Sequence, residues 1–390
     1  MVFLYGGSSN PLRGPGDGRR DRMKSIVYFA DLRTSPRKNL LGKIGSLLDA
    51  VGLADRVRKD ALVAVKLHFG EAGNTAYIRP IFIRKIIDSI REAGANPFLT
   101  DTNTLYVGSR SNSVDHIRTA IQNGFAYPVV NAPLIVADGL RGASETAVTI
   151  NMKHFDQVYI ASDIARADAI VSVAHFKGHE LSGFGGTIKN LGMGCASRRG
   201  KLAQHSTVTP KVKRKKCAGC GRCMTYCAHN AISMVDGKAK IDPEKCVGCG
   251  ECIIVCPNLA IQIRWNQTVP VFMENLVEYT AGVLKGKKNA AVFLNFITQV
   301  SPACDCYPYN DAPIVPDIGI VASNDPVAID QASADLVNEA EGLKSSSLTK
   351  NLEPGKDKFR ALYPKVDWEI QLKYAQQIGL GTRDYEIVRI

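Results

Sequence analysis

The sequence contains no hydrophobic run long enough to cross a membrane. Its longest apolar stretches, such as residues 290–297, are much shorter than the ~20 apolar residues of a membrane-spanning helix. The first 22 residues also lack the apolar segment that marks a secretory signal peptide. We therefore expect no membrane span and a cytoplasmic location.

Acidic residues are in short supply, with 37 Asp and Glu against 49 Lys and Arg, which gives a net charge of +12. A basic surface attracts anions of several kinds, so the charge alone does not identify a partner. The densest basic run, residues 211–216, has no interleaved aromatic residues, and the chain has no nucleic-acid-reading motif. Nucleic acid is therefore not the expected partner. The run is either a solvated linker or a docking patch for an acidic redox partner protein.

The composition also excludes an intrinsically disordered chain. Hydrophobic residues make up 45% and charged residues 22% of the 390 residues, which is ordinary for a globular protein with a real core. This length allows two or more domains. We expect only residues 1–23, which are rich in Gly, Pro and Arg, to form a disordered leader.

Eight of the eleven cysteines form two runs with identical spacing, 29 positions apart at each cysteine. This is the spacing of bacterial ferredoxins, in which the fourth cysteine of each run binds the cluster of the other run. The sequence therefore predicts two [4Fe-4S] clusters. The first is expected on Cys217, Cys220, Cys223 and Cys256, and the second on Cys246, Cys249, Cys252 and Cys227.

The residues around the cysteines agree with this interpretation. Gly221 and Gly250 occupy the same gap in each run, where a tight loop must bring its backbone close to the cluster. Asp236-Gly237 predicts a hairpin turn between the runs. The second run is followed by Pro257, whereas the first is followed by Ala228. Because proline at this position shapes the chain and binds no iron, its absence does not affect the prediction. Neither disulfides nor zinc sites predict two identical four-cysteine runs around a hairpin.

Strand-like and helix-like segments alternate on both sides of the cysteine runs, which predicts an α/β fold. We expect a doubly wound, mostly parallel sheet interrupted by a small α+β ferredoxin domain, with a polar, basic linker at residues 200–216. The predicted strands are residues 25–31, 61–68, 97–100, 134–137, 157–161, 169–174, 291–296 and 318–322, and the predicted helices are residues 38–51, 80–93, 113–123 and 272–284, with a further helix from Asp325-Pro326. The expected domains are residues 24–210 and 268–390 for the two parts of the α/β domain and 211–267 for the ferredoxin.

Three cysteines remain: Cys195, Cys304 and Cys306. Cys304 and Cys306 share a turn-rich segment, and Cys195 ends a glycine-rich one. Three thiolates could hold a third iron-sulfur cluster or another metal with one open position. The alternative is three unrelated buried thiols.

A further group of polar residues follows the predicted strands. In open α/β sheets, ligands bind at the carboxyl ends of strands, and a glycine-rich turn that enters a helix offers free N–H groups to an anion. We expect His175 or His179 to supply a proton and Lys177 to act beside them. The predicted residues for binding a small anionic substrate are Lys66, His68, Gly185, Gly186, Lys189 and Asn190. Asp101 follows a neighbouring strand and is expected near the same pocket.

With these residues assembled, the chain resembles a family of uncharacterised iron-sulfur centre proteins that share a domain of unknown function. The resemblance covers most of residues 24–340. It is carried by Lys66 and His68, by the segments 175–179 and 189–192, and by Asp325-Pro326-Val-Ala-Ile-Asp330. It implies two [4Fe-4S] clusters and a redox role in anaerobic or facultative metabolism, without a settled substrate.

We therefore expect an oxidoreductase in which the ferredoxin domain passes electrons into a pocket of the α/β domain. An electron-transfer or cluster-delivery protein without its own substrate is the first alternative. The second is a non-redox enzyme in which the clusters serve only to stabilise the fold.

Overall fold

The computed structural model describes residues 24–206, 209–264 and 266–390. The leader predicted for residues 1–23 lies outside these ranges. None of the helices within them is long and apolar enough to cross a membrane.

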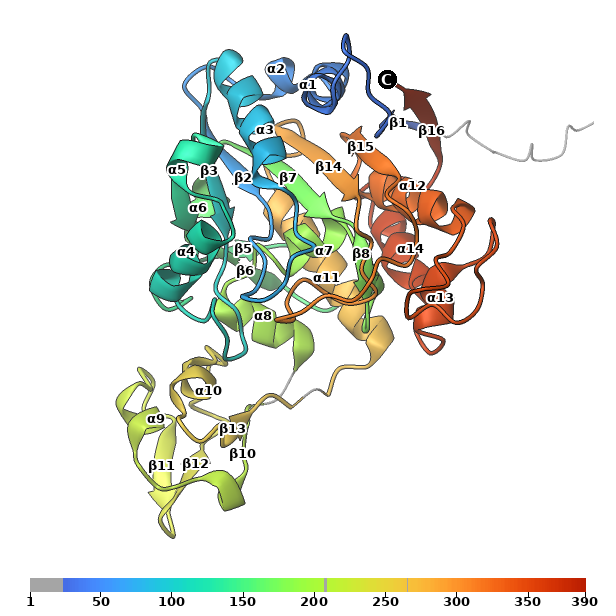
Figure 1. The fold of residues 1–390 in the computed structure, drawn as a ribbon. Coiled ribbons are helices and arrows are strands. Elements are labelled where there is room, and N and C mark those ends of the chain that lie inside the picture. Colours follow the sequence, from blue (N-terminus) through green and yellow to red (C-terminus); the bar gives the residue numbers. More distant parts are fainter. Residues whose placement is uncertain (1–23, 207–208, 265) are drawn as a thin grey trace, which may run out of the picture.

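The centre of the fold is an eight-stranded sheet (Figure 1). Seven strands run parallel, and only β15 runs against its two neighbours. The predicted mostly parallel sheet is therefore confirmed. Across the sheet, the order is β16 (Tyr385–Arg389), β1 (Ser25–Asp31), β15 (Gly319–Ser323), β14 (Ala291–Ile297), β7 (Ala169–His175), β2 (Leu62–Lys66), β3 (Asn96–Asp101) and β4 (Leu134–Val136).

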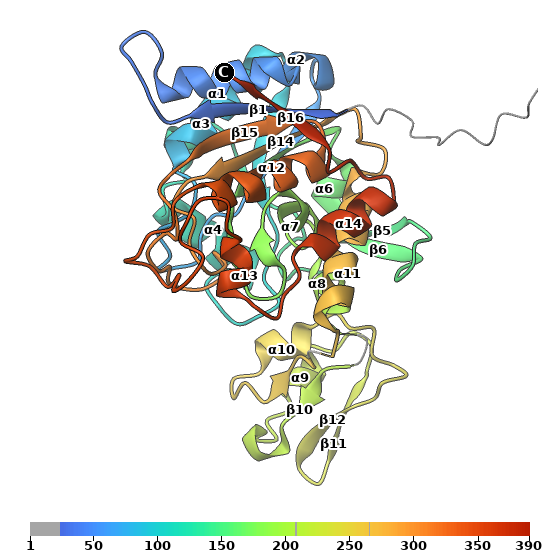
Figure 2. The same ribbon diagram turned by 90° about the vertical axis from the view of Figure 1, so that its right-hand side faces the viewer.

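Helices cover both faces of the sheet, and each face has its own core (Figure 2). Successive strand residues alternate between the two cores: Val63 and Val65 join one, and Ala64 joins the other. The first core takes side chains from α1 (Leu40–Ala50), α2 (Leu53–Arg56), α3 (Pro80–Glu92), α4 (Ser113–Gln122) and α5 (Tyr127–Val130). The second takes them from α6 (Ser162–Arg166), α7 (Thr187–Gly192), α11 (Val269–Leu284), α12 (Pro326–Glu339), α13 (Lys358–Leu362) and α14 (Glu369–Gln377).

Two small hairpins lie outside the central sheet. β5 (Glu145–Thr149) pairs with β6 (Gln157–Ala161), and β8 (Lys177–His179) pairs with β9 (Gly183–Gly185). The predicted strand at residues 157–161 therefore exists, but it does not join the central sheet.

A cysteine-rich unit, residues 211–264, extends from one end of the molecule (Figure 1). The chain enters it after α8 (Arg198–His205), so the predicted linker at residues 200–216 begins inside a helix. At the expected hairpin turn, Asp236 and Gly237 both have positive φ, at 49° and 68°, as a two-residue hairpin requires. The unit's elements are β10 (Lys211–Val212), η1 (Arg214–Lys216), α9 (Arg222–Thr225), β11 (Ile232–Val235), β12 (Lys238–Ile241), α10 (Glu251–Val255) and β13 (Ile261–Gln262).

The carboxylate of Asp330 on α12 binds the N-terminus of α7. It accepts hydrogen bonds from the backbone N–H groups of Thr187 at 2.7 Å and Ile188 at 2.9 Å. The side-chain amide of Asn295 on β14 donates a third, at 2.8 Å. A side chain at Gly186 would meet this carboxylate at 2.4 Å. Asp330 therefore joins a helix, a strand and a glycine-rich turn that are far apart in the sequence.

Replacing this carboxylate should destabilise the fold. In Asp330→Asn, one N–H group of α7 faces an amide NH2 instead of an oxygen, and we expect a loss of about 2 kcal/mol in the free energy of unfolding. Denaturant unfolding under argon measures this loss. Asp55→Asn, which changes an exposed acid, is the matched control, and equal stability of the two variants would contradict the assignment.

Candidate functional site

The eight cysteines of the two runs come together in two groups of four. Cys217, Cys220 and Cys223 line one pocket with Cys256. Cys227 lies within electrostatic range of Cys249 and Cys252, as does Cys246. Burial raises the pKa of Cys223, Cys249 and Cys252. Each group thus combines three thiols of one run with the last thiol of the other.

The loops that carry the two groups have the same backbone conformation. Gly219 and Gly248 have φ of 72°, and Gly221 and Gly250 have φ of 73°. These values lie in the left-handed region that favours glycine. A side chain at Gly219 would also meet the carbonyl oxygen of Gly237 at 2.4 Å.

Backbone amides donate to equivalent thiols in the two groups. The N–H of Ala231 lies 3.3 Å from Cys227 Sγ, and the N–H of Ala260 lies 3.2 Å from Cys256 Sγ. Such bonds stabilise cluster-bound thiolates and tune their potential. Among the described residues, no three His, Cys, Asp or Glu side chains converge to hold a single metal ion. A four-iron cluster spreads its ligands over four corners, so these donor sets fit it without such convergence.

One cysteine run faces the α/β domain. A side chain at Gly250, between Cys249 and Cys252, would meet Leu105 at 3.0 Å and Arg198 at 3.3 Å. Arg198 also forms an ion pair of 2.6 Å with Glu251 and donates to the carbonyl oxygen of Ser111. We call Cys246, Cys249 and Cys252 the inner run. Cys217, Cys220 and Cys223 form the outer run, in which Cys220 is exposed.

The polar residues predicted at the strand ends meet at one edge of the central sheet. Lys66 ends β2, Asp101 ends β3 and His175 ends β7. Because these strands are parallel, their carboxyl ends lie side by side. The loop after β14 brings Cys304 and Cys306 to the same edge, where ligands bind in open α/β sheets.

Asp305 anchors this loop to the end of β7 and the start of β8. Its fully buried carboxylate lies 2.9 Å from His175 Nδ1 and 3.1 Å from Lys177 Nζ. Burial works against the charge on Asp305, but His175 and Lys177 outweigh it and hold the pKa of Asp305 well below its usual value. The other ring nitrogen of His175 faces the carbonyl oxygen of Thr298 at 2.9 Å. Both ring nitrogens of His175 therefore lie within hydrogen-bond distance of an oxygen atom.

Gly178 lets the same loop approach closely. Its N–H donates to the carbonyl oxygen of Ser301 at 2.8 Å. A side chain at Gly178 would meet the carbonyl oxygen of Pro302 at 2.0 Å. Residues 175–179 were predicted to be catalytic. In the structure they hold the loop that carries Cys304 and Cys306 in position.

The thiols of Cys304 and Cys306 lie next to the basic side chains of Lys189 and His68. Cys304 Sγ lies 2.9 Å from Cys306 Sγ and 2.9 Å from Lys189 Nζ, and Cys306 Sγ lies 3.9 Å from His68 Nε2. A hydrogen bond from the Cys304 thiol lowers the pKa of Cys306 well below its usual value. Burial opposes the charge on Lys189, but the two thiols outweigh it and raise its pKa. The arrangement stabilises one thiolate.

A buried ionic network adjoins the thiols. Lys66 Nζ lies 3.0 Å from Asp101 and 3.0 Å from Asn190 Oδ1. Arg110 bridges Asp101 at 3.3 Å and Glu71 at 3.2 Å. Burial works against the charge on Asp101, yet its cationic neighbours, led by Lys66, lower its pKa. Lys66 and Asn190, both predicted to bind substrate, therefore already have partners within the protein.

Tyr106 connects this network to the thiol loop. Its hydroxyl donates to the carbonyl oxygen of Cys306 at 3.0 Å and accepts from Arg110 at 2.7 Å. The sequence did not predict Tyr106, Arg110, Glu71 or the role of Asp305 at this site. The only local signal was an acidic residue between two cysteines.

Several predicted roles change in the structure. The N-terminus of α7, expected to bind a substrate anion through Gly185 and Gly186, is occupied by the Asp330 carboxylate. His179, the second expected proton donor, is buried beside Ser182 Oγ at 2.9 Å, and burial lowers its pKa.

Cys195 does not join the other two thiols. Its Sγ lies 3.9 Å from the carbonyl oxygen of Asn190. Burial raises its pKa to about 12, and its charged neighbours are Lys66, Asp101, Lys201 and Lys287. Cys304 and Cys306 are therefore a pair in this structure and not part of a three-thiol group.

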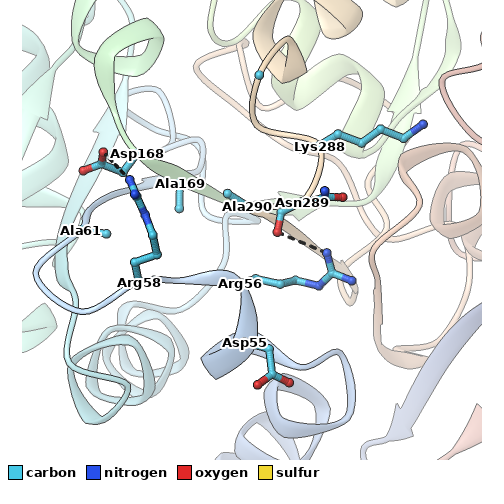
Figure 3. A pocket seen from close by; sticks show the side chains of 10 residues that line it. Asp55, Arg56, Arg58, Ala61, Asp168, Ala169, Lys288, Asn289 and Ala290 are labelled. Atoms are coloured by element: carbon cyan, nitrogen blue, oxygen red, sulfur yellow. Dashed lines mark hydrogen bonds and ion pairs between the residues drawn. The ribbon is translucent and has the colours of Figure 1, made fainter.

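A hollow of about 390 Å³ lies at the opposite edge of the sheet, where β2, β7 and β14 begin (Figure 3). Arg58 points to Asp168 there, at 3.4 Å, and Arg56 donates to the carbonyl oxygen of Asn289 at 3.5 Å. No residue of the predicted site lines this hollow, so we place the candidate site at the carboxyl edge.

The anchoring role of Asp305 can be tested by Asp305→Asn. The change leaves Lys177 buried without its counter-charge and His175 without its carboxylate partner, so the free energy of unfolding should fall by about 3–5 kcal/mol. Because the pKa of Asp305 is lowered in the folded state, its contribution is present at neutral pH and is lost only below about pH 4. Thermal unfolding from pH 8 to pH 5 should therefore show a stability gap between wild type and variant that does not narrow as the pH falls.

Asp311→Asn is the control, because Asp311 lies exposed in the same loop. A gap that narrows between pH 8 and pH 5, or a variant as stable as the control, would show that the carboxylate is not held as described.

Comparisons with known proteins support a family assignment. No curated protein matches the chain. The lactate racemase apoprotein from Thermoanaerobacterium thermosaccharolyticum matches at 13% identity and a TM-score of 0.35, over 71% of this chain and 51% of that one. A protein from Thermotoga maritima matches at 8% identity and a TM-score of 0.36, over 87% of this chain and 58% of that one. The chain thus spans just over half the length of each, and likenesses this weak carry no argument. The model of the family "Domain of unknown function (DUF362)" matches residues 63–335, most of the chain, and the protein belongs to this family.

Proposed function

We propose that this protein is an iron-sulfur oxidoreductase that delivers electrons to a small anionic substrate at the carboxyl edge of its α/β domain. We place it in the cytoplasm, in anaerobic or facultative metabolism. The observation that carries the proposal is the contact of the inner run with Leu105 of the α/β domain. The next residue, Tyr106, bonds to the loop that carries Cys304 and Cys306. The proposal is supported by membership of the DUF362 family and by eleven cysteines, which are compatible with iron-sulfur binding.

The two thiol groups would each hold one [4Fe-4S] cluster. Cys217, Cys220, Cys223 and Cys256 form the outer group, and Cys246, Cys249, Cys252 and Cys227 form the inner group. When bound, such clusters supply single electrons at a potential set by their surroundings. The N–H groups of Ala231 and Ala260 would stabilise the ligating thiolates.

A short connection runs from the inner group to the candidate site. Leu105 contacts the backbone position of Gly250, and the next residue, Tyr106, donates to the carbonyl oxygen of Cys306 at 3.0 Å. Two consecutive residues therefore link the inner run and the thiol loop. Electrons reaching the inner group would enter the α/β domain along this connection.

Lys189 and His68 are suited to act on a substrate at this edge. Both side chains are partly exposed, unlike His175 and His179. The N–H of Gly70 donates to His68 Nδ1 at 3.0 Å, so the neutral ring carries its proton on Nε2, which faces Cys306. Lys189 would bind the anionic group, and His68 would supply the proton.

The outer run has the features of an entry point for electrons. Lys213, Arg214, Lys215 and Lys216 are all exposed directly before Cys217, and Cys220 in the same run is exposed. A basic surface beside an exposed redox centre favours encounter with an acidic partner protein.

Iron content tests the two-cluster assignment. Anaerobically purified protein should contain about eight iron atoms, and Cys249→Ser should contain about four, because one of the two thiol groups loses a ligand. Iron and acid-labile sulfide assays measure both, with Cys195→Ala as the control that keeps about eight. Protein without iron after reconstitution would refute the proposal, and about twelve atoms would indicate a third cluster.

Charge neutralisation tests the docking surface. Replacing Lys213, Arg214, Lys215 and Lys216 by Gln should slow electron uptake from an acidic reduced ferredoxin by at least about tenfold at low salt and abolish its salt dependence. Stopped-flow absorbance of the iron-sulfur chromophore measures the rate.

The matched control replaces four exposed lysines of the α/β domain, Lys344, Lys350, Lys356 and Lys365. Equal slowing in the two variants would show that only the overall charge matters and that the run is not a docking surface.

A further inference from the structure

Cys304 and Cys306 form a close pair outside the eight cysteines of the two runs. Their sulfur atoms are 2.9 Å apart, and the N–H of Cys306 lies 3.4 Å from Cys304 Sγ. Asp305 between them is anchored by His175 and Lys177. The backbone that joins the two thiols is therefore held so that the sulfurs face each other, and forming a bond between them requires little movement.

A second loop holds the far side of the pair. The side-chain amide of Asn74 donates to the carbonyl oxygens of Tyr307 at 3.4 Å and Tyr309 at 3.2 Å. A side chain at Gly73 would meet the carbonyl oxygen of Pro308 at 2.4 Å. The segment from Cys304 to Tyr309 is thus fixed from both sides.

The two thiols differ in their access to solvent. Cys304 is 3% exposed, whereas Cys306 is partly exposed. Next to Cys306, the side chains of Tyr307 and Tyr309 are 37% and 56% exposed, with ring centroids 5.6 Å apart. One reachable thiol backed by a buried one is the arrangement that thiol–disulfide exchange uses, because the second thiol resolves the mixed disulfide.

We propose that Cys304 and Cys306 form a dithiol–disulfide redox site whose substrate is a disulfide. This inference rests on the proposed function for its supply of electrons. The third thiol needed for a cluster at this position is absent from the pair, because Cys195 Sγ lies beside the carbonyl oxygen of Asn190.

The reaction has two halves. In the first, the Cys306 thiolate attacks one sulfur of the substrate disulfide, forming a mixed disulfide and releasing one thiolate. The Cys304 thiol then gives its proton to the released thiolate and attacks Cys306 Sγ, which releases the second thiolate and leaves a Cys304–Cys306 disulfide. In the second half, this disulfide takes up two electrons, one at a time, from a low-potential one-electron donor, together with one proton, and the Cys304 thiol and the Cys306 thiolate are restored. Lys189, 2.9 Å from Cys304 Sγ, and His68, 3.9 Å from Cys306 Sγ, are placed to stabilise the thiolates and return a proton.

The exchange half is tested with oxidised glutathione as the probe. Anaerobic, iron-loaded protein is incubated with oxidised glutathione, alkylated with iodoacetamide and digested. The mass of the peptide that contains residues 304–306 is then measured by mass spectrometry. In the wild type, this peptide should lose two hydrogen atoms and resist alkylation. Cys304→Ser should instead retain glutathione on Cys306, and Cys306→Ser should retain none. Cys195→Ala, a buried thiol elsewhere in the fold, should behave as the wild type.

Two outcomes would overturn this half of the inference. One is a wild-type protein in which both thiols of the pair remain open to alkylation. The other is glutathione retained by Cys306→Ser as strongly as by Cys304→Ser, which would remove the assignment of Cys306 as the attacking thiol.

The electron-uptake half is tested on protein whose pair is already a disulfide, with photoreduced deazaflavin as the one-electron donor. The wild-type peptide should regain both hydrogen atoms, whereas Cys252→Ser, which lacks an inner-run ligand, should regain them at least tenfold more slowly. Equal rates would overturn the link between the pair and the inner run. Protein with full iron but no disulfide chemistry would refute this inference alone. Iron-free protein that still exchanges with glutathione would refute the proposed function alone.

Discussion

The candidate site depends on one buried carboxylate. Asp305 has no exposure to solvent and lies between His175 and Lys177, which both end up beneath the loop after β14. Removing two charges from water is costly, and only close pairing offsets that cost. The interaction therefore fixes the loop in one position, and with it the positions of the Cys304 and Cys306 sulfurs relative to Lys189 and His68.

The same principle explains why this edge of the sheet carries so many charged residues. Groups that would suit a substrate anion are largely occupied by the protein's own carboxylates. Asp330 takes the N-terminus of α7, Asp101 takes Lys66, and Asp305 takes Lys177. What remains partly exposed is a smaller set around the two thiols. The chemistry proposed for the site follows from these remaining groups, and the buried ion pairs hold them in place.

The fold and the cysteine groups could be predicted from sequence because their signals are local. Strand and helix patterns placed β1, β7 and α3 within a residue or so, and the repeated cysteine spacing specified which thiols would meet. The antiparallel direction of β15 leaves no such local trace. The pairing of Asp305 with His175, 130 positions apart, could not be predicted either, because spacing does not show which buried charges will meet. For the same reason, Cys195 could not be separated from Cys304 and Cys306 in advance.

We propose that electrons collected by the two cysteine groups reach the thiol pair of Cys304 and Cys306 in the α/β domain. The most direct measurement is an anaerobic coulometric titration of the fully oxidised protein, followed to its end point. Two one-electron clusters and one two-electron disulfide predict an uptake of about four electrons per chain. An uptake of about two electrons, with the Cys304–Cys306 peptide unchanged in mass, would show that the pair takes no electrons from the clusters.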